Sequence, residues 1–147
     1  MADRISIVAR PTPMSTPYNG FFWEGAREGR LLIQRCADCA TYQHPPGPLC
    51  PVCGGRMVTP VEVSGLGHID AFTIIRRVFH PAFKSEIPYV VARILLDEQA
   101  DLILVTNILD CEIDSVETGM RVKVVFKHEG DWTLPQFVPD AFEGAQS

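Results

Sequence analysis

Residues 36–53 read CADCATYQHPPGPLCPVC and contain two Cys-x-x-Cys pairs, Cys36 with Cys39 and Cys50 with Cys53. Two residues between cysteines allow one tight turn to direct both sulfurs at a single ion, and two such turns facing each other complete a tetrahedron. The ten residues between the pairs are fewer than in most zinc-site patterns, but they suffice for a short ribbon hairpin. The segment therefore predicts a zinc ribbon that holds one structural zinc ion per chain.

Alternatives to a zinc site fit the spacing of the cysteines less well. Iron in a rubredoxin-like centre is an alternative, because tetrahedral sulfur also suits iron. Free thiols or a redox pair would not explain two facing pairs. His44 lies between the pairs and could replace a sulfur, but four well-spaced cysteines already complete the site. Four thiolates leave no open coordination position, so the ion is expected to stabilise the fold and not to activate water.

The residues before the metal segment predict an arm and one helix. Residues 1–15 are polar and proline-bearing, which is typical of a terminal arm that is disordered or lies on a partner. Thr16 suits the N-cap and Pro17 the first position of a helix over residues 17–28, and Gly29 suits a left-handed stop.

Three consecutive aromatic residues, Phe21, Phe22 and Trp23, fall within this predicted helix. A helix cannot hide all three in one narrow apolar stripe. Either they cover the neighbouring domains, or at least one of them inserts into a partner protein. We therefore assign them as candidate partner-docking residues.

The chain after Gly54-Gly55 alternates apolar and polar residues between turn signals, which is typical of an antiparallel sheet with one buried face. The clearest alternation runs from Met120 to Lys127. Five short strands after a metal module suggest a small Greek-key barrel of the OB type, with a five-stranded sandwich as the alternative. The five expected strands cover residues 58–63, 68–78, 89–96, 102–109 and 120–127.

The expected fold class is mainly β, with an N-terminal helix, a zinc ribbon and a C-terminal five-stranded OB-type barrel. The length of 147 residues suits one globular unit, or a small module joined to a domain of about 100 residues. The expected domains are an arm (1–15), a helix-and-ribbon module (16–56), the barrel (57–138) and a tail (139–147).

Composition and charge narrow the classes of function. No apolar run approaches the roughly 18 residues of a membrane span, and the first ten residues lack a secretory apolar segment. We therefore expect a cytoplasmic protein without a membrane partner. The net charge is −5, and four thiolates (−4) with one dication (+2) would make it −7. This acidity disfavours binding along phosphate backbones, although zinc ribbons and OB folds do serve nucleic-acid-binding proteins.

A series of short motifs resembles a known protein family. Over residues 18–138 their order is similar to that of the zinc-ribbon plus OB-fold proteins known as domain of unknown function 35. Each motif is weak alone, and the ordered set is specific. The one departure is His44, where the family usually has an aromatic residue before Pro-Pro. The motifs are Phe22-Trp23-Glu24-Gly25, Gly29-Arg30-Leu31, Gln34-Arg35-Cys36, Pro45-Pro46, Cys53-Gly54, Ser64-Gly65-Leu66-Gly67, Pro88-Tyr89, Gly119-Met120-Arg121-Val122 and Leu134-Pro135-Gln136-Phe137.

The resemblance implies a rubredoxin-like ribbon and an OB-type barrel. It also implies enzyme partners: thiolase-like enzymes, sterol-carrier-type thiolases or aldolases, acyltransferases, or hydratases that act on acyl-CoA. Members often serve as required non-catalytic subunits, and some contact coenzyme A. We therefore expect a non-catalytic accessory subunit of an acyl-CoA-processing complex. A nucleic-acid-binding module is the alternative, and an independent enzyme is a third hypothesis.

The remaining candidates are few. Arg76, Arg77 and Lys84 form the one basic cluster of the barrel half, either as a solvated loop or as a site for the phosphates of coenzyme A. Cys111 has no basic neighbour or nucleophile motif and is expected to be a small packing residue. The two histidines of the strand region and its loop, His68 and His80, are expected to face solvent or to form hydrogen bonds. No constellation of catalytic residues is recognisable.

Overall fold

The computed structural model describes residues 11–140, so the predicted arm up to residue 10 and tail from residue 141 lie outside it. Within these residues the chain is mainly β, as predicted, with one α-helix, a three-stranded sheet and a closed five-stranded barrel. No helix in this range is long and apolar enough to cross a membrane.

The helix α2 (Gly20–Arg27) begins three residues later than predicted. The Thr16 hydroxyl accepts hydrogen bonds from the backbone N–H groups of Tyr18 and Asn19, each at 3.2 Å, so it caps the turn that precedes the helix. Gly29 adopts φ 75° directly after the helix, which confirms the predicted left-handed stop.

The ribbon sheet has the strand order β2–β1–β3 and consists of β1 (Leu32–Cys36), β2 (Tyr42–Gln43) and β3 (Val58–Glu62). The placement of residues 58–63 in the barrel was wrong, because β3 pairs antiparallel with β1 along its whole length. Alternation of apolar and polar residues identifies a strand but does not identify its neighbour. In this chain the strand returns to the metal module.

The barrel has the strand order β4–β5–β6–β8–β7 and closes where β7 pairs with β4. Four of its strands match predicted ones, and β8 was missed. β8 contains Pro135 in its interior and ends at Pro139, and a proline in the sequence argues against a strand. The strands are β4 (Leu66–Ile75), β5 (Tyr89–Leu96), β6 (Ile103–Ile108), β7 (Arg121–Glu129) and β8 (Trp132–Pro139).

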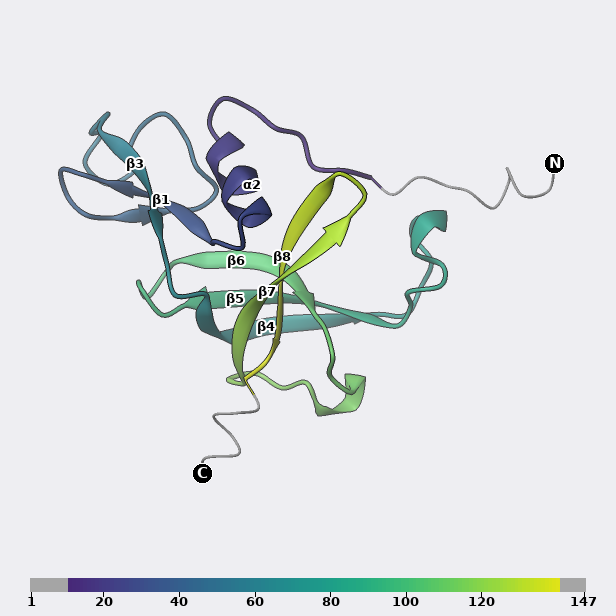
Figure 1. Ribbon diagram of the computed structural model, residues 1–147. Coiled ribbons are helices and arrows are strands. Elements are labelled where there is room, and N and C mark those ends of the chain that lie inside the picture. The colour runs from purple at the N-terminus through teal and green to yellow at the C-terminus, as the bar shows by residue number, and fades with distance from the viewer. Residues whose placement is uncertain (1–10, 141–147) are drawn as a thin grey trace.

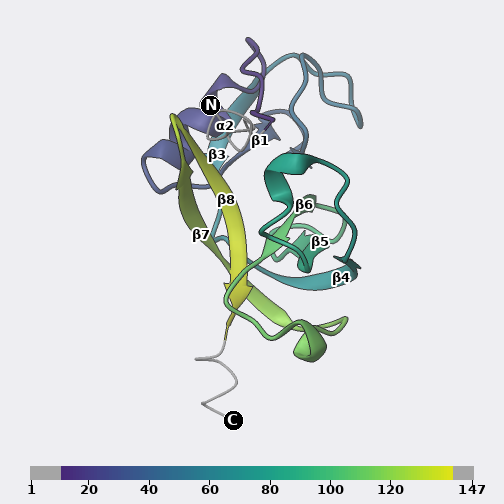
Figure 2. The same ribbon diagram turned by 90° about the vertical axis from the view of Figure 1, so that its right-hand side faces the viewer.

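Figure 1 shows the ribbon sheet and the barrel as neighbours, with α2 above the barrel between the ribbon and the tip of the β7–β8 hairpin. The loop between β4 and β5 carries the 3₁₀ turn η1 (Pro81–Phe83) and projects from the barrel on the far side from the ribbon. In the view of Figure 2, η1 lies in front of the strands β5 and β6.

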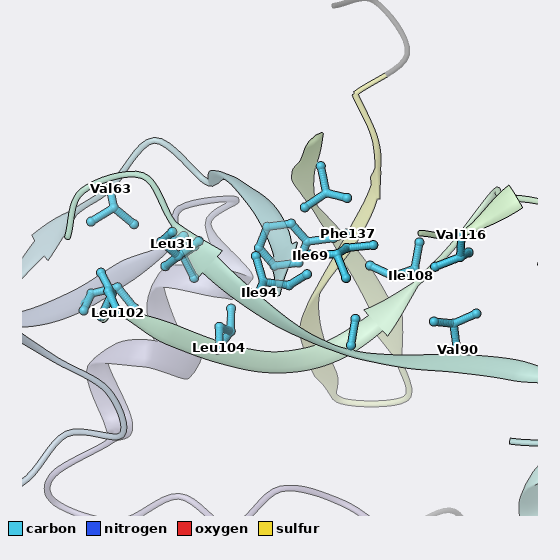
Figure 3. Packing of buried hydrophobic residues seen from close by; sticks show 14 of the residues in the cluster. Leu31, Val63, Ile69, Val90, Ile94, Leu102, Leu104, Ile108, Val116 and Phe137 are labelled. Carbon is cyan, nitrogen blue, oxygen red and sulfur yellow. The ribbon is translucent and has the colours of Figure 1, made fainter. Parts of the chain in front are cut away.

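One hydrophobic core joins the helix, the ribbon and the barrel. Phe22 of α2 and Ile33 of β1 belong to the same cluster as the barrel residues. Figure 3 shows Phe137 near the centre of this cluster, with Leu102 toward one end and Val90 toward the other. The side chains of Ile33 and Phe137 have no exposed surface. Burial of this kind contributes about 1.5–3 kcal/mol per large apolar side chain.

Polar contacts also fix the ribbon on the barrel. Gln99 lies in the turn between β5 and β6, and its side-chain carbonyl accepts from the Tyr42 N–H at 2.9 Å. Its amide group donates to the Tyr42 carbonyl at 3.1 Å. The adjacent Glu98 carboxylate accepts from the Ser64 N–H at 2.8 Å, at the link between the two modules. The β5–β6 turn therefore holds both β2 and the linker.

Candidate metal centre and adjoining cleft

The four predicted cysteines lie together at one end of the ribbon. All four Sγ atoms lie within 4.8 Å of one another. The Sγ atoms of Cys36 and Cys53 are 3.6 Å apart, and those of Cys39 and Cys50 are 3.5 Å apart. A tetrahedron with metal–sulfur bonds of about 2.3 Å has edges of about 3.8 Å, whereas a disulfide requires about 2.05 Å. The group therefore fits one tetrahedral metal ion.

The two cysteine turns share one backbone conformation. The Ala40 N–H donates to the Cys36 carbonyl at 2.8 Å, and the Gly54 N–H donates to the Cys50 carbonyl at 2.9 Å. The residue that closes each turn is left-handed, with φ 65° at Ala40 and φ 75° at Gly54. The second turn uses glycine for this conformation, and the first turn uses an alanine at a steric cost.

The thiols differ in burial and in acidity. Cys36 and Cys50 are buried, and Cys39 and Cys53 are exposed. The Thr41 hydroxyl, 3.1 Å from Cys39 Sγ, lowers the pKa of that thiol to about 6. At Cys53 the Gly55 N–H lowers the pKa, but the neighbouring sulfurs, first that of Cys36, raise it to about 12. A dication is needed to keep four such thiols deprotonated together, and acid competes with it.

His44 is not a member of the ligand group, which among the described residues consists of the four cysteines. Its ring centroid lies 5.0 Å from that of Phe22. Burial lowers the pKa of His44 to about 4, so the imidazole is neutral at pH 7. His44 therefore packs as an aromatic ring at the position where the resemblance leads us to expect one.

The three adjacent aromatic residues of α2 have different environments. Phe22 is only 6 % exposed and lies in the core, so its assignment as a docking residue was wrong. The half-buried Trp23 ring makes edge contacts with Phe22 at 4.9 Å and with Trp132 at 5.4 Å between centroids. Phe21 is also half-buried and packs against the core cluster. Because α2 packs on both the barrel and the ribbon, it buries a wider apolar stripe than a helix with a single contact surface.

The predicted basic cluster lies on the projecting loop between β4 and β5. Arg76, Arg77 and Lys84 are all exposed. None of them forms an ion pair with another residue between 11 and 140. Phe79, on the same loop, is 73 % exposed. The loop therefore presents both cations and apolar surface to the solvent.

Cys111 and His80 have structural roles. Cys111 packs against the core cluster, and its Sγ lies 3.3 Å from the Ser115 Oγ, which confirms a packing role. His80 Nδ1 accepts from the Ala82 N–H at 3.1 Å and caps η1, as expected for a hydrogen-bonded histidine.

A cleft that sequence reasoning missed lies between β6 and β8. It consists of three adjoining cavities of about 350, 390 and 250 Å³, and all three are lined by Asn107 and Gln136. The Gln136 amide group donates to Asn107 Oδ1 at 3.1 Å, and the Asn107 amide group donates to the Val90 carbonyl at 3.0 Å. The one signal of this cleft in the sequence was the motif Leu134-Pro135-Gln136. It belongs to the motifs that resemble the known family, and it contains the amide side chain of Gln136.

Two family models match consecutive parts of the chain. Residues 23–58 match the model described as "ChsH2, rubredoxin-like zinc ribbon domain". Residues 60–127 match the model described as "ChsH2, C-terminal OB-fold domain". The boundary between the two models falls at the start of β3, so the OB-fold model includes most of this third strand of the ribbon sheet.

Two relatives are similar over most of the chain. A "Probable enoyl-CoA hydratase alpha subunit" of Thermomonospora curvata is 42 % identical over 131 residues, which cover 88 % of this chain and 40 % of that protein. The chain thus spans about two fifths of this relative's length. A "DUF35 domain-containing scaffold protein" of Methanothermobacter thermautotrophicus is 33 % identical over 98 residues, which cover 66 % of this chain and 71 % of that protein.

Two solved structures share the fold. A chain of the structure named "Ltp2-ChsH2(DUF35) aldolase" superposes with a TM-score of 0.79 and 40 % identity, covering 87 % of this chain and 98 % of that one. A DUF35-family protein of Sulfolobus solfataricus superposes with a TM-score of 0.61 at 17 % identity, which shows the fold alone.

Proposed function

Because the chain belongs to the DUF35 family of zinc-ribbon and OB-fold proteins, we propose that it is a non-catalytic accessory subunit of a cytoplasmic acyl-CoA-processing complex. The similarity to the chain of the Ltp2-ChsH2(DUF35) aldolase carries the proposal, because it combines 40 % identity with 98 % coverage of that chain. The hydratase and scaffold names of the other relatives support the same class. The partner would be a thiolase-like enzyme, an aldolase, an acyltransferase or a hydratase.

The metal centre supports a structural contribution. We assign zinc to it, with one ion per chain, held by Cys36, Cys39, Cys50 and Cys53. Four sulfurs saturate a tetrahedral zinc ion, so the ion would fix the ribbon and take no part in turnover. The partner enzyme then supplies the catalytic residues.

The helix-and-ribbon half is the proposed docking surface. Eight large hydrophobic residues of the described chain are exposed, and five of them lie between residues 14 and 57. Their concentration in one part of the chain supports an interface there. Phe21 and Trp23 contribute their exposed parts to this surface, and Phe21 lines a shallow groove on it. The five exposed residues are Met14, Tyr18, Leu49, Val52 and Met57.

A matched pair of charge substitutions tests the docking surface. Val52 on the ribbon is 70 % exposed, and Val78, on the loop between β4 and β5, is 43 % exposed. The partner is first identified by native co-purification and mass spectrometry. Val52→Glu is then expected to weaken its association by about 2 kcal/mol or more, because a charge is buried in the interface. Val78→Glu is the control and should leave association unchanged. Equal effects of the two substitutions, at unchanged thermal unfolding, would contradict this docking surface.

We further propose that the loop cations contact the phosphates of coenzyme A. Arg76, Arg77 and Lys84 are exposed and carry no ion-pair partner within residues 11–140, so they are available to an anion. The doubly substituted chain Arg76→Glu/Arg77→Glu should lose affinity for coenzyme A, measured by calorimetry at low salt. Unchanged affinity would exclude this loop as the phosphate site.

A further inference from the structure

The two cysteine turns have equivalent backbones beyond the cysteines themselves. In each turn the N–H of the first cysteine donates to the carbonyl of the residue five positions later, at 2.9 Å in both turns. That residue is Thr41 in the first turn and Gly55 in the second. Its own N–H forms a hydrogen bond with the sulfur of the second cysteine, which is Cys39 or Cys53. Thr41 and Gly55 therefore occupy equivalent positions beside the two exposed sulfurs.

The side chains at these equivalent positions differ. Thr41 Oγ1 lies 3.1 Å from Cys39 Sγ. A metal-bound thiolate carries no proton, so the Thr41 hydroxyl is the donor of this hydrogen bond in the metal-bound chain. Gly55 has no side chain, and no other side-chain N–H or O–H group of residues 11–140 donates to Cys53. Cys39 therefore accepts from an O–H and an N–H, and Cys53 accepts from an N–H alone.

The packing around Gly55 excludes a second hydroxyl from the centre. A Cβ atom at this position would lie 2.6 Å from Asp38 Oδ2, 3.2 Å from Cys53 Sγ and 3.4 Å from Cys36 Sγ. A side chain here would displace the Asp38 carboxylate and crowd two sulfurs that the metal holds in place. The polar atom nearest to this point is a carboxylate oxygen, which accepts hydrogen bonds and cannot supply one when ionised. The difference between the two exposed sulfurs is therefore a consequence of how the turns pack.

Hydrogen bonds to a thiolate lower its reactivity. The thiolate is the nucleophilic form of cysteine, and its reaction with an electrophile removes the negative charge. A donor stabilises the anion more than the uncharged product, because hydrogen bonds to charged groups are the stronger ones. Each donor therefore raises the barrier to attack by the sulfur. Cys36 and Cys50 are buried, so the comparison concerns the exposed Cys39 and Cys53.

We propose that Cys53 is the reactive thiolate of the metal centre, and that soft carbon electrophiles modify it before the other three ligands. In this step Cys53 Sγ forms a bond to the electrophilic carbon. The bond from that carbon to its leaving group breaks, and the leaving group departs with the electron pair. The resulting thioether is uncharged and no longer offers the thiolate that the site requires, so the modification also loosens the metal and the ribbon. The Thr41 hydroxyl protects Cys39 from the same reaction.

The test uses the full chain loaded with its metal, and iodoacetamide as the electrophile. The initial rate of alkylation at each cysteine is measured by peptide mass spectrometry, before much of the metal is lost. Cys53 is expected to react about tenfold faster than Cys39, because it has one charge-assisted hydrogen bond fewer. Release of the metal to a chromophoric chelator should follow the labelling of Cys53. Cys111 lies outside the ligand group and supplies an internal reference rate.

Two substitutions of Thr41 separate the effect of the hydrogen bond from that of exposure. Thr41→Val keeps the branched shape of the side chain but removes the hydroxyl, so Cys39 should react about tenfold faster and approach the rate of Cys53. Thr41→Ser keeps the hydroxyl and should keep the preference for Cys53. The rates at Cys53 and Cys111 should be the same in both variants as in the unsubstituted chain.

Equal or faster labelling of Cys39 in the unsubstituted chain, or a ratio of rates that Thr41→Val leaves unchanged, would overturn the inference. Should Thr41→Val not keep its metal, the ratio in the unsubstituted chain decides the question. The inference rests on the metal centre and not on the accessory role. Metal content is measured before labelling, so a chain without metal contradicts the centre itself. A metal-loaded chain that labels Cys39 and Cys53 equally removes this inference alone.

Discussion

The ribbon and the barrel of this chain are stabilised by different means. Outside β1, whose Ile33 belongs to the core shared with the barrel, the ribbon has one buried residue from residue 37 to residue 62, Cys50. The barrel, in contrast, buries side chains on all five strands, and Ile69, Ile94 and Phe137 have no exposed surface. The ribbon therefore depends on its metal ion and on its attachment to the barrel, and the barrel depends on apolar packing. Substitutions that act on one module and spare the other can test this contrast.

The largest effect is expected from Cys50→Ser. Loss of one thiolate should release the metal. The ribbon has few buried apolar residues of its own, so it then loses its main stabilising interaction. Structural zinc contributes about 10–16 kcal/mol to small zinc-finger peptides, so the ribbon should unfold. Metal analysis and backbone amide spectra measure this outcome. Ile94→Ala should have the opposite pattern: a loss of about 2–5 kcal/mol in the free energy of unfolding with the metal retained.

Cys111→Ser is the control for Cys50→Ser, because Cys111 lies outside the ligand group. It should keep one equivalent of metal. A Cys50→Ser chain that keeps a native ribbon spectrum without metal would contradict the dependence of the ribbon on its ion.

The next largest effect concerns acid stability. Burial lowers the pKa of His44 to about 4, below the 6.5 of an unfolded histidine. Protonation therefore favours the unfolded chain, so the stabilisation is complete above about pH 6.5 and is lost as the pH falls toward 4. The difference corresponds to roughly 3 kcal/mol at most. His44→Phe keeps a ring without a proton to gain, and its free energy of unfolding should fall less over this pH range.

The metal site also weakens in acid, but its four ligands are the same in both proteins. The difference between their pH profiles therefore isolates His44. Parallel profiles for His44→Phe and the unsubstituted chain would show that His44 is not buried as a neutral ring.

A smaller effect is expected at the contact between the two modules. Gln99→Ala removes both hydrogen bonds to the Tyr42 backbone, which should cost about 1–2 kcal/mol and speed hydrogen exchange in β2. Asp101→Ala is the control, because Asp101 bonds the same Gln99 amide group but does not contact Tyr42. Equal exchange rates in the two variants would mean that Gln99 does not couple the ribbon to the barrel.

The smallest effects compare the two cysteine turns. Ala40→Gly should stabilise the chain by up to about 1 kcal/mol, because a left-handed alanine is replaced by a residue that favours this conformation. Gly54→Ala should destabilise it by about 1–2 kcal/mol for the same reason. Thermal unfolding of the metal-bound chains measures both. If both substitutions stabilise the chain, or both destabilise it, the two turns are not equivalent.

Local signals made most of the fold predictable. The β5 range of residues 89–96 was predicted to the residue, because a β-branched run lies between Pro88 and the polar turn at Asp97. The cysteine quartet follows from spacing within 18 residues. β8 was missed because Pro135 and Pro139 are unfavourable in a strand unless no ladder hydrogen bond needs their missing N–H, and this depends on the neighbours that the strand acquires in the assembled barrel.

The cleft could not be predicted for the same reason. It requires knowing that β6 and β8 form one register pair, and that α2, from a distant part of the sequence, lines the cavity beside them. Neither feature leaves a periodic pattern in the sequence. Trp23 and Gln136 were part of the family-like motifs, but their convergence on one cavity appears only in three dimensions.

The most direct measurement of the central claim is acyl-CoA turnover by the co-purified partner enzyme, assayed with this chain, without it, and for this chain alone. An accessory subunit predicts background turnover for the chain alone and full turnover only when both proteins are present. Robust turnover by the chain alone, or full turnover by the partner without it, would contradict the account.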